Sequence, residues 1–141
     1  MTGVETFWAA VDQSAGPDGC WPWRLSRSEK RRGYGQVRWQ GKTRRAHIVA
    51  YELTIGRVPD GKHLDHTCHD PNTCIEPCPH TACCNPSHLE PVTQAENNSR
   101  RARRTCGRGH PKTAEHGYPR GTNWRCRTCE NVTQRVRRSV A

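Results

Sequence analysis

The chain has 141 residues, which is enough for one small domain or for one domain with an appendage. Only 32% of the residues are hydrophobic, with a single Phe and a single Met, so a large apolar core is excluded. Chains this poor in core residues usually need disulfides or bound metal for stability. The formal net charge of +10 favours a partner that is rich in phosphate.

Nine cysteines and eight histidines supply candidate metal ligands. Because the cysteine count is odd and cysteines repeatedly lie near histidines, the pattern favours zinc over a disulfide framework. No apolar run is long enough to span a membrane, and the first residues, MTGVETFWAAVDQ, lack the apolar centre of a signal peptide. We therefore expect a cytoplasmic protein without membrane contact.

The N-terminal part of the chain predicts a helix and a hairpin. Val4 to Gln13 is expected to be a short helix that ends at the breakers following it. The aromatic stretch Cys20 to Leu25 suits a strand, and Gly33 to Trp39 is expected to be its hairpin partner. A turn at residues 40–42 follows. We favour core packing for the tryptophans, with contact to nucleic acid as the alternative.

A helix is expected from Arg44 to Ile55, because apolar residues recur at helical spacing and Gly56 ends the pattern. His47 lies within this helix. It is either a site residue or a satisfied, half-buried histidine, and we slightly favour the second interpretation.

The centre of the chain predicts a strand, a loop and a second helix. His63 to His66 is expected to be a strand, and Thr67 to Pro86 shows almost no hydrophobic periodicity, so metal is expected to order it. Thr93 and Glu96 form a capping box, which predicts a helix from about Gln94 to Arg103. Two β segments, the loop and this helix would make a ββα unit.

The C-terminal part has the spacing of a zinc ribbon. A CxxxH motif and a CxxC motif are separated by a stretch that contains Gly and Pro, and their ligands are Cys106, His110, Cys126 and Cys129. A basic helix is expected from about Arg127 to Ser139. The predicted domains are residues 1–104 and residues 105–141.

Asp65, His66 and Asn97 are the candidate catalytic residues. Hydrolysis of a phosphodiester needs a base to activate water and a cation to stabilise the leaving oxygen. A neutral histidine serves as such a base near neutral pH, and Mg²⁺ prefers carboxylate and amide oxygens. His66 supplies the imidazole, while Asp65 and Asn97 supply the oxygens.

Three motifs resemble the HNH endonucleases: Asp65-His66, the run Cys83 to Leu89 with sequence CCNPSHL, and Glu96-Asn97. The cysteines resemble those of the related His-Cys box homing endonucleases. The resemblance covers about Cys20 to Arg100, and it implies a phage-type enzyme in a bacterial or phage-infected cell. It also implies an α+β, ββα-metal (His-Me finger) fold, with a general base at His66 and a catalytic metal ion (Mg²⁺ or another divalent cation) at Asn97 and Asp65.

The resemblance allows two alignments of His88. In a plain HNH nuclease this histidine binds the catalytic metal, and Asn85 orients the base or shapes the loop. In a His-Cys box enzyme it joins three cysteines on structural zinc. We prefer the second alignment, in which the zinc ligands are Cys20, Cys68, Cys83 and His88.

The loop between Cys68 and Cys83 departs from both families. An additional zinc ion is expected there, and the candidate ligands are His69, Cys74, Cys78 and His80, with Cys84 as a spare. Two to three structural zinc ions per chain are therefore expected.

The sequence thus predicts a metal-dependent DNA endonuclease. It is compatible with a homodimer as well as with a monomer. The alternative is a zinc-dependent regulator that binds nucleic acid without cutting it. The arginines expected to contact DNA are Arg38, Arg44, Arg45, Arg100, Arg101, Arg103, Arg104, Arg135, Arg137 and Arg138.

Overall fold

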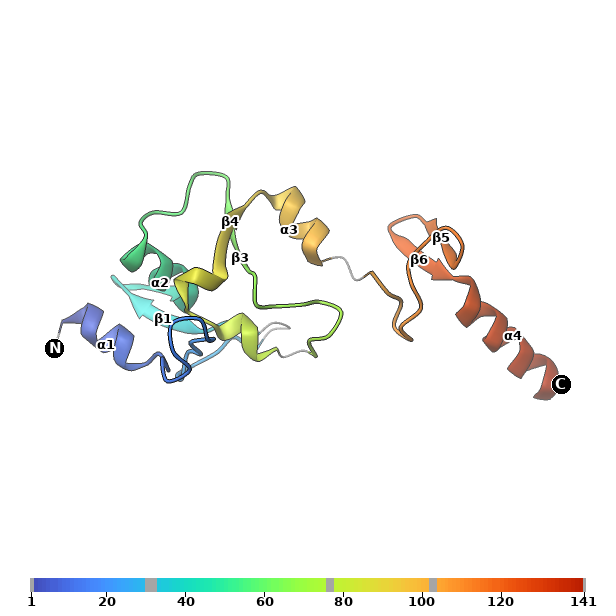
Figure 1. Cartoon of the computed structure of the whole chain (residues 1–141), viewed down its shortest axis with the longest axis horizontal. Coiled ribbons are helices and arrows are strands. Elements are labelled where there is room, and N and C mark those ends of the chain that lie inside the picture. The colour runs from blue at the N-terminus through green and yellow to red at the C-terminus, as the bar shows by residue number, and fades with distance from the viewer. Residues whose placement is uncertain (1, 30–32, 76–77, 102–103, 141) are drawn as a thin grey trace. The chain divides into compact units, whose positions relative to one another are not determined.

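The computed structural model describes residues 2–29, 33–75, 78–101 and 104–140. The chain forms two compact units, Met1–Arg101 and Ala102–Ala141, which are described separately below (Figure 1). Both are small, mixed arrangements of short helices and two-stranded antiparallel sheets. None of the helices among the described residues is long and apolar enough to cross a membrane.

Helix α1 spans Gly3–Ala9 and is shorter than predicted. It begins with a capping box in which the Thr2 hydroxyl accepts from the Glu5 amide and the Glu5 carboxylate accepts from the Thr2 amide. The helix stops early because the residues after it pair with another segment. Val11 forms a β-bridge with Trp23, and the amide of Asp12 donates to the Pro22 carbonyl.

Strand β1, Gln36–Trp39, pairs with β2, Lys42–Arg45, rather than with the aromatic stretch. The predicted hairpin between Cys20–Leu25 and Gly33–Trp39 is therefore wrong. Gln40 and Gly41 join β1 to β2 and both have positive φ, as the tight two-residue turns of hairpins require.

The aromatic stretch forms bridges to separate parts of the chain instead of one ladder. Pro22 has no amide hydrogen to donate, and it bridges to Cys83. The amide of Trp23 donates to Ala82, and that of Arg24 donates to Ala10. The stretch therefore links α1 to the later loop.

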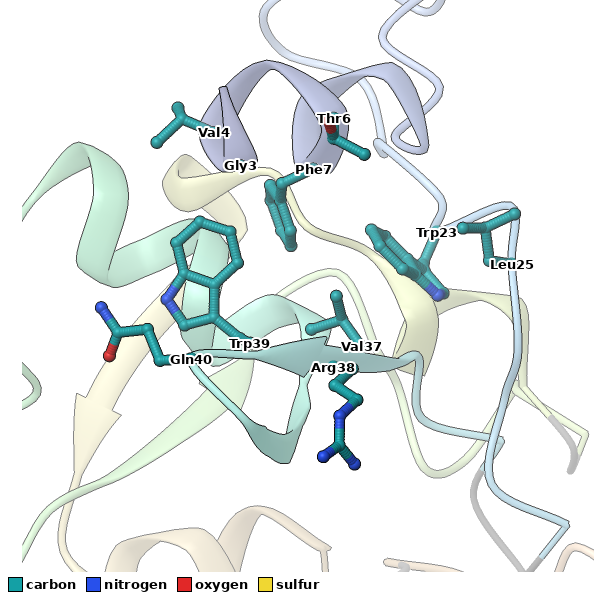
Figure 2. Close-up of a pocket in the computed structure, with 10 residues that line it drawn as sticks. All are labelled: Gly3, Val4, Thr6, Phe7, Trp23, Leu25, Val37, Arg38, Trp39 and Gln40. Carbon is teal, nitrogen blue, oxygen red and sulfur yellow. The ribbon is translucent and has the colours of Figure 1, made fainter. Parts of the chain in front are cut away.

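Part of the core of the first unit lies between α1 and β1. Phe7 packs against Trp23 and Trp39, with ring centroids 5.2 and 5.9 Å apart. Figure 2 shows Phe7 pointing from α1 toward Trp39 and Val37 of β1, at a surface pocket of about 590 Å³, with Arg38 directed away on the other side of the strand. Trp23 is only 3% exposed, so the expectation of core packing is confirmed for this residue.

Helix α2 spans Ala46–Thr54 and begins two residues later than predicted, because the arginines before it belong to β2. Its inward face buries Ala46, Val49 and Ala50 completely, as the helical spacing of the apolar residues indicated. The same helix carries His47 into the interior.

Strand β3, His63–His66, has the predicted bounds and pairs with β4, Leu89–Val92. The intervening loop contains two short 3₁₀ turns, η1 (Pro79–Ala82) and η2 (Pro86–His88). Helix α3, Gln94–Arg101, follows β4 and packs against β3 (Figure 1).

The predicted capping box of α3 is confirmed. The Glu96 amide donates to the Thr93 hydroxyl across 3.2 Å, and the Thr93 amide donates to the Glu96 carboxylate across 2.8 Å. Residues 102–103, the end of the predicted helix, lie outside the described residues.

The second unit is a hairpin followed by a helix. Strand β5, Gly117–Arg120, pairs with β6, Asn123–Cys126, and α4 spans Arg127–Val140. The predicted basic helix is therefore confirmed, with one more residue at its end. It leaves the valines at 132, 136 and 140 exposed.

Candidate metal centres and active site

His66 lies at the end of β3 and is 5% exposed. Its Nε2 lies 3.1 Å from the carbonyl oxygen of Cys83, so this nitrogen carries the proton that it donates. Its ring packs against His47, with centroids 4.6 Å apart, and against Tyr34 at 6.0 Å. Burial lowers the pKa of His66 below its usual value, which favours the neutral ring.

Asp65 precedes His66 and is opposite Glu90 in the β3–β4 register. Its Oδ2 accepts from Nη1 of Arg100 across 3.3 Å, and the same nitrogen donates to Glu90 across 2.6 Å. The α3 arginine thus joins two carboxylates, one from each strand. The contact of Arg100 with Asp65 is longer than its contact with Glu90, so it is the weaker of the two ion pairs.

Asn97 projects from α3 and is 3% exposed. Its Oδ1 is buried and has no hydrogen-bond partner among the described residues. A buried carbonyl without a partner is costly, and most such groups in proteins have one. A divalent cation would satisfy this oxygen, so the donor fits the hard metal ion predicted from the sequence.

The first of the Cys/His clusters lies in the first unit, where ligand atoms of Cys20, Cys68, Cys83 and His88 are all within 4.8 Å of one another. Nδ1 of His88 lies 3.6 Å from Sγ of both Cys20 and Cys83. Three sulfurs and one imidazole are the donors of a closed tetrahedral zinc site. His88 thus sits where the second of the two alignments puts it.

Cys83 is the most thiolate-like residue of this cluster. The pKa of its thiol is lowered, first because the Cys68 thiol donates to it and then because the backbone amides of Asn85 and Trp21 do. These amides lie 3.5 and 3.4 Å from the sulfur. A thiolate is the form of cysteine that binds metal.

Asn85 shapes the loop that carries Cys20 to the cluster. Its side-chain amide donates to the carbonyls of Pro17 and Gly19 across 2.8 and 2.7 Å, and its Oδ1 accepts from the Ser87 amide. Asn85 is 2% exposed, and its buried bonds hold together two segments that are distant in sequence, the loop at Asn85 and the loop at Pro17 to Gly19.

A second cluster forms in the loop that departs from both families. His69, Cys74 and Cys78 have ligand atoms within 4.8 Å of one another. Nδ1 of His80 lies 3.2 Å from the Cys74 sulfur and 3.3 Å from the Cys78 sulfur. Cys84, the spare candidate, points elsewhere: its Sγ is 3.7 Å from the Ala82 carbonyl, and it belongs to the apolar core.

The third cluster, in the second unit, consists of Cys106, His110, Cys126 and Cys129. Nδ1 of His110 lies 3.4, 3.5 and 3.3 Å from the three sulfurs. The β5–β6 hairpin and the first turn of α4 supply two of the cysteines, as in a zinc ribbon.

The arginines predicted to contact DNA differ in what already binds them. Both Nη atoms of Arg44 donate to Glu52, across 2.7 and 2.9 Å. Arg45 lies over the Tyr34 ring, 4.6 Å from its centroid. Arg38 and the three arginines at 135, 137 and 138 are exposed, Arg101 is half-buried, and Arg103 lies outside the described residues.

His47 is the residue that the sequence interpretation underrated. It is 2% exposed, and its Nδ1 has no hydrogen-bond partner among the described residues, so the favoured interpretation as a satisfied, half-buried histidine is wrong. Burial lowers its pKa well below the usual value. A polar residue on the inward face of an otherwise apolar helix was the available signal.

The profile of a family described as HNH endonuclease matches residues 44–75. The matched residues include His47, Asp65 and His66, and the predicted resemblance is thereby confirmed. Protein 2.8 of Escherichia phage T7 is 33% identical over 81 residues, which are 57% of this chain and 48% of that protein. The chain thus matches about half the length of this phage relative. No solved structure matches the chain.

Proposed function

We propose that this protein is a metal-dependent DNA endonuclease, with His66 as the general base and Asp65 and Asn97 as ligands of the catalytic metal. One observation carries the proposal. A buried, neutral histidine, an adjacent carboxylate and a buried amide oxygen without a partner among the described residues occur together on β3 and on the helix packed against it. In this proposal β3, β4 and α3 are the ββα unit, and the HNH match supports it.

His66 is suited to take a proton from water. Because Nε2 donates to the Cys83 carbonyl, the neutral ring leaves Nδ1 as the acceptor. The carbonyl also fixes the direction of the ring. A positioned base of this kind contributes about 10²–10⁴-fold in rate.

Asp65 and Asn97 offer the oxygen ligands that Mg²⁺ or Mn²⁺ prefers. Such a cation would supply charge stabilisation at the phosphate and at the leaving oxygen. Arg100 is held by Glu90 and orients the Asp65 carboxylate on the side of β3 that faces α3.

The three Cys/His clusters are proposed to hold structural zinc. The chain has few core residues, so bound metal would supply much of the folding free energy. The residues from 105 onward are proposed to form a zinc ribbon whose helix α4 contacts the DNA backbone through its arginines.

A zinc-dependent regulator that binds nucleic acid without cutting it is the second candidate. The ion pair between Asp65 and Arg100 favours it, because a carboxylate engaged by an arginine is less available to metal. The positive net charge fits both candidates equally.

Incubation of purified protein with supercoiled plasmid, with and without added Mg²⁺ or Mn²⁺, separates the two. The proposal expects nicked or linear product that depends on the added metal and is absent with His66→Ala. Retarded but uncut plasmid under all these conditions would support the regulator.

A further inference from the structure

A polar cavity lies between α2, β3 and α3, beside the proposed base His66. Its volume is about 380 Å³. Residues of all three elements line it, including His47 of α2, His63 and Leu64 of β3, and Asn97 and Arg101 of α3. Asp65 and His66 are not among the lining residues.

Two residues of this lining each carry a buried polar atom that has no hydrogen-bond partner among the described residues. His47 is 2% exposed and Asn97 is 3% exposed, and among the described residues His47 Nδ1 and Asn97 Oδ1 both lack a hydrogen bond. Asn97 is accounted for by the proposed metal. His47 has no such role, although burying its nitrogen without a partner costs stability. The tautomer with the proton on Nδ1 offers a donor for an anionic oxygen.

The charge of the lining is positive. Arg45, Lys62 and Arg101 all contribute to it. Among the described residues of the lining, Glu52 is the one carboxylate, and it is already paired with both Nη atoms of Arg44, across 2.7 and 2.9 Å. Three cationic side chains and an imidazole donor around one cavity form a site for a phosphate.

We infer that this cavity binds the backbone phosphate next to the one that is cut, with His47 donating to a phosphate oxygen and Arg45, Lys62 and Arg101 supplying the charge. The inference rests on the proposed function, which identifies the ligand as nucleic acid. His47 then acts as a substrate-binding residue, and a phosphate oxygen satisfies its buried Nδ1.

The phosphate is assigned to a flanking position because of the register of β3. His63, Leu64 and the proposed metal ligand Asn97 line the cavity. The proposed base His66 and the other metal ligand, Asp65, lie two residues further along the strand than Leu64 and His63. Two residues of a strand span about 7 Å, which is on the order of the separation between successive phosphates. The cavity and the proposed catalytic residues can therefore hold neighbouring phosphates of one strand.

The alternative is that His47 only fills space beneath His66 and Tyr34. The two roles predict different results for His47→Leu, which keeps similar bulk and removes the unsatisfied nitrogen. If His47 only fills space, the His47→Leu protein should bind DNA with the affinity of the parent. If His47 binds the phosphate, the His47→Leu protein should bind DNA more weakly, even though it is as stable as the parent or more stable.

The experiment measures thermal unfolding and affinity for a duplex, without added divalent metal, for the parent, His47→Leu and His47→Gln. We expect His47→Leu to melt no lower than the parent and to bind about tenfold more weakly, since hydrogen bonds to charged groups are the stronger class. His47→Gln restores an N–H donor and is expected to recover part of the affinity.

Single methylphosphonate substitutions along the duplex then locate the contact. At one position, next to the mapped cut, the neutral linkage should abolish the difference between the parent and His47→Leu. Parent-like affinity of His47→Leu would overturn the inference, as would a difference that persists at every position. A drop in melting temperature and affinity that His47→Gln does not rescue would also overturn it.

Failure of the phosphate site and failure of the proposed endonuclease function give different results in these experiments. A protein that cuts DNA but shows no coupling between His47 and any phosphate retains its endonuclease role and loses this site. A protein that never cuts but shows the coupling at one phosphate retains the phosphate site, while the endonuclease proposal fails.

Discussion

His66 donates its Nε2 proton to the carbonyl oxygen of Cys83, and the Sγ of the same Cys83 lies in the cluster with Cys20, Cys68 and His88. One residue therefore connects the proposed base to the proposed zinc site. The direction of the imidazole depends on the backbone at Cys83, so zinc bound to this cluster would also orient the proposed base.

The first prediction concerns His66→Ala. It should reduce plasmid cleavage by about 10²–10⁴-fold, because the base is lost. Zinc content should be unchanged, since His66 is outside the cluster. Cys83→Ser should lower both zinc content and cleavage. Cleavage by His66→Ala at the parent rate would remove the base assignment.

The second prediction is the number of zinc ions. Elemental analysis should find three per chain, one for each cluster. Cys78→Ser should lower the count by one, because its sulfur lies in the loop cluster. Cys84→Ala is the matched control: this neighbouring buried cysteine bonds to Ala82 and should keep all three. Equal zinc content in the two variants would contradict the loop site.

The third prediction concerns Asn97. Asn97→Ala should lose cleavage that added Mn²⁺ or Mg²⁺ does not restore, because a metal ligand is missing. Asn97→Asp keeps an oxygen at the same place and should retain part of the activity. Rates measured across a metal titration test this. If the Asp variant were as inactive as the Ala variant at saturating metal, the ligand role would lose its support.

The fourth prediction separates two adjacent arginines. Arg44→Gln should lower stability by about 0.5–1 kcal/mol, because it breaks a partly buried, bidentate salt bridge to Glu52. Arg45→Gln should leave stability near that of the parent and weaken DNA binding, since Arg45 is one of the residues that line the polar cavity and its guanidinium lies over the Tyr34 ring. Thermal melts and binding isotherms of both variants test this, and interchanged effects would contradict it.

The pH dependence of the same pair has a defined sign. Arg44 lowers the pKa of Glu52 below its usual value, so the carboxylate stabilises the folded state at pH above about 4.5. That contribution is lost as the pH falls through the lowered pKa. The difference in stability between the parent and Arg44→Gln should therefore shrink in acid.

The fifth prediction concerns α4. Replacing Arg135, Arg137 and Arg138 together by Gln should flatten the dependence of DNA affinity on salt by up to about 0.9 in slope for each phosphate that is no longer neutralised. Arg57→Gln is the control, because it removes a surface arginine that is paired with Asp60. Binding isotherms at several salt concentrations measure the slopes. Equal slopes in the triple variant and the parent would exclude contact between these α4 arginines and the DNA backbone.

Local signals predicted those parts of the fold that depend on neighbouring residues. The strand from His63 to His66, the Thr93–Glu96 capping box and the basic helix near the C-terminus were all predicted correctly. Each depends on side chains within a few positions of one another, so the sequence was sufficient. The resemblance to HNH endonucleases was also recognisable from short motifs, and the family match confirms it.

Only the tertiary structure decided the pairings between distant segments. It placed β1 against β2, because Pro22 and Trp23 pair with two other parts of the chain, the residues after α1 and the loop at Ala82 and Cys83. It also packed the rings of His47 and His66 edge to face and paired Arg44 with Glu52. Alternation and spacing specify which residues turn inward, but the partner that each one meets depends on chain segments that the local pattern does not identify. The unsatisfied nitrogen of His47 became visible only when its surroundings were known.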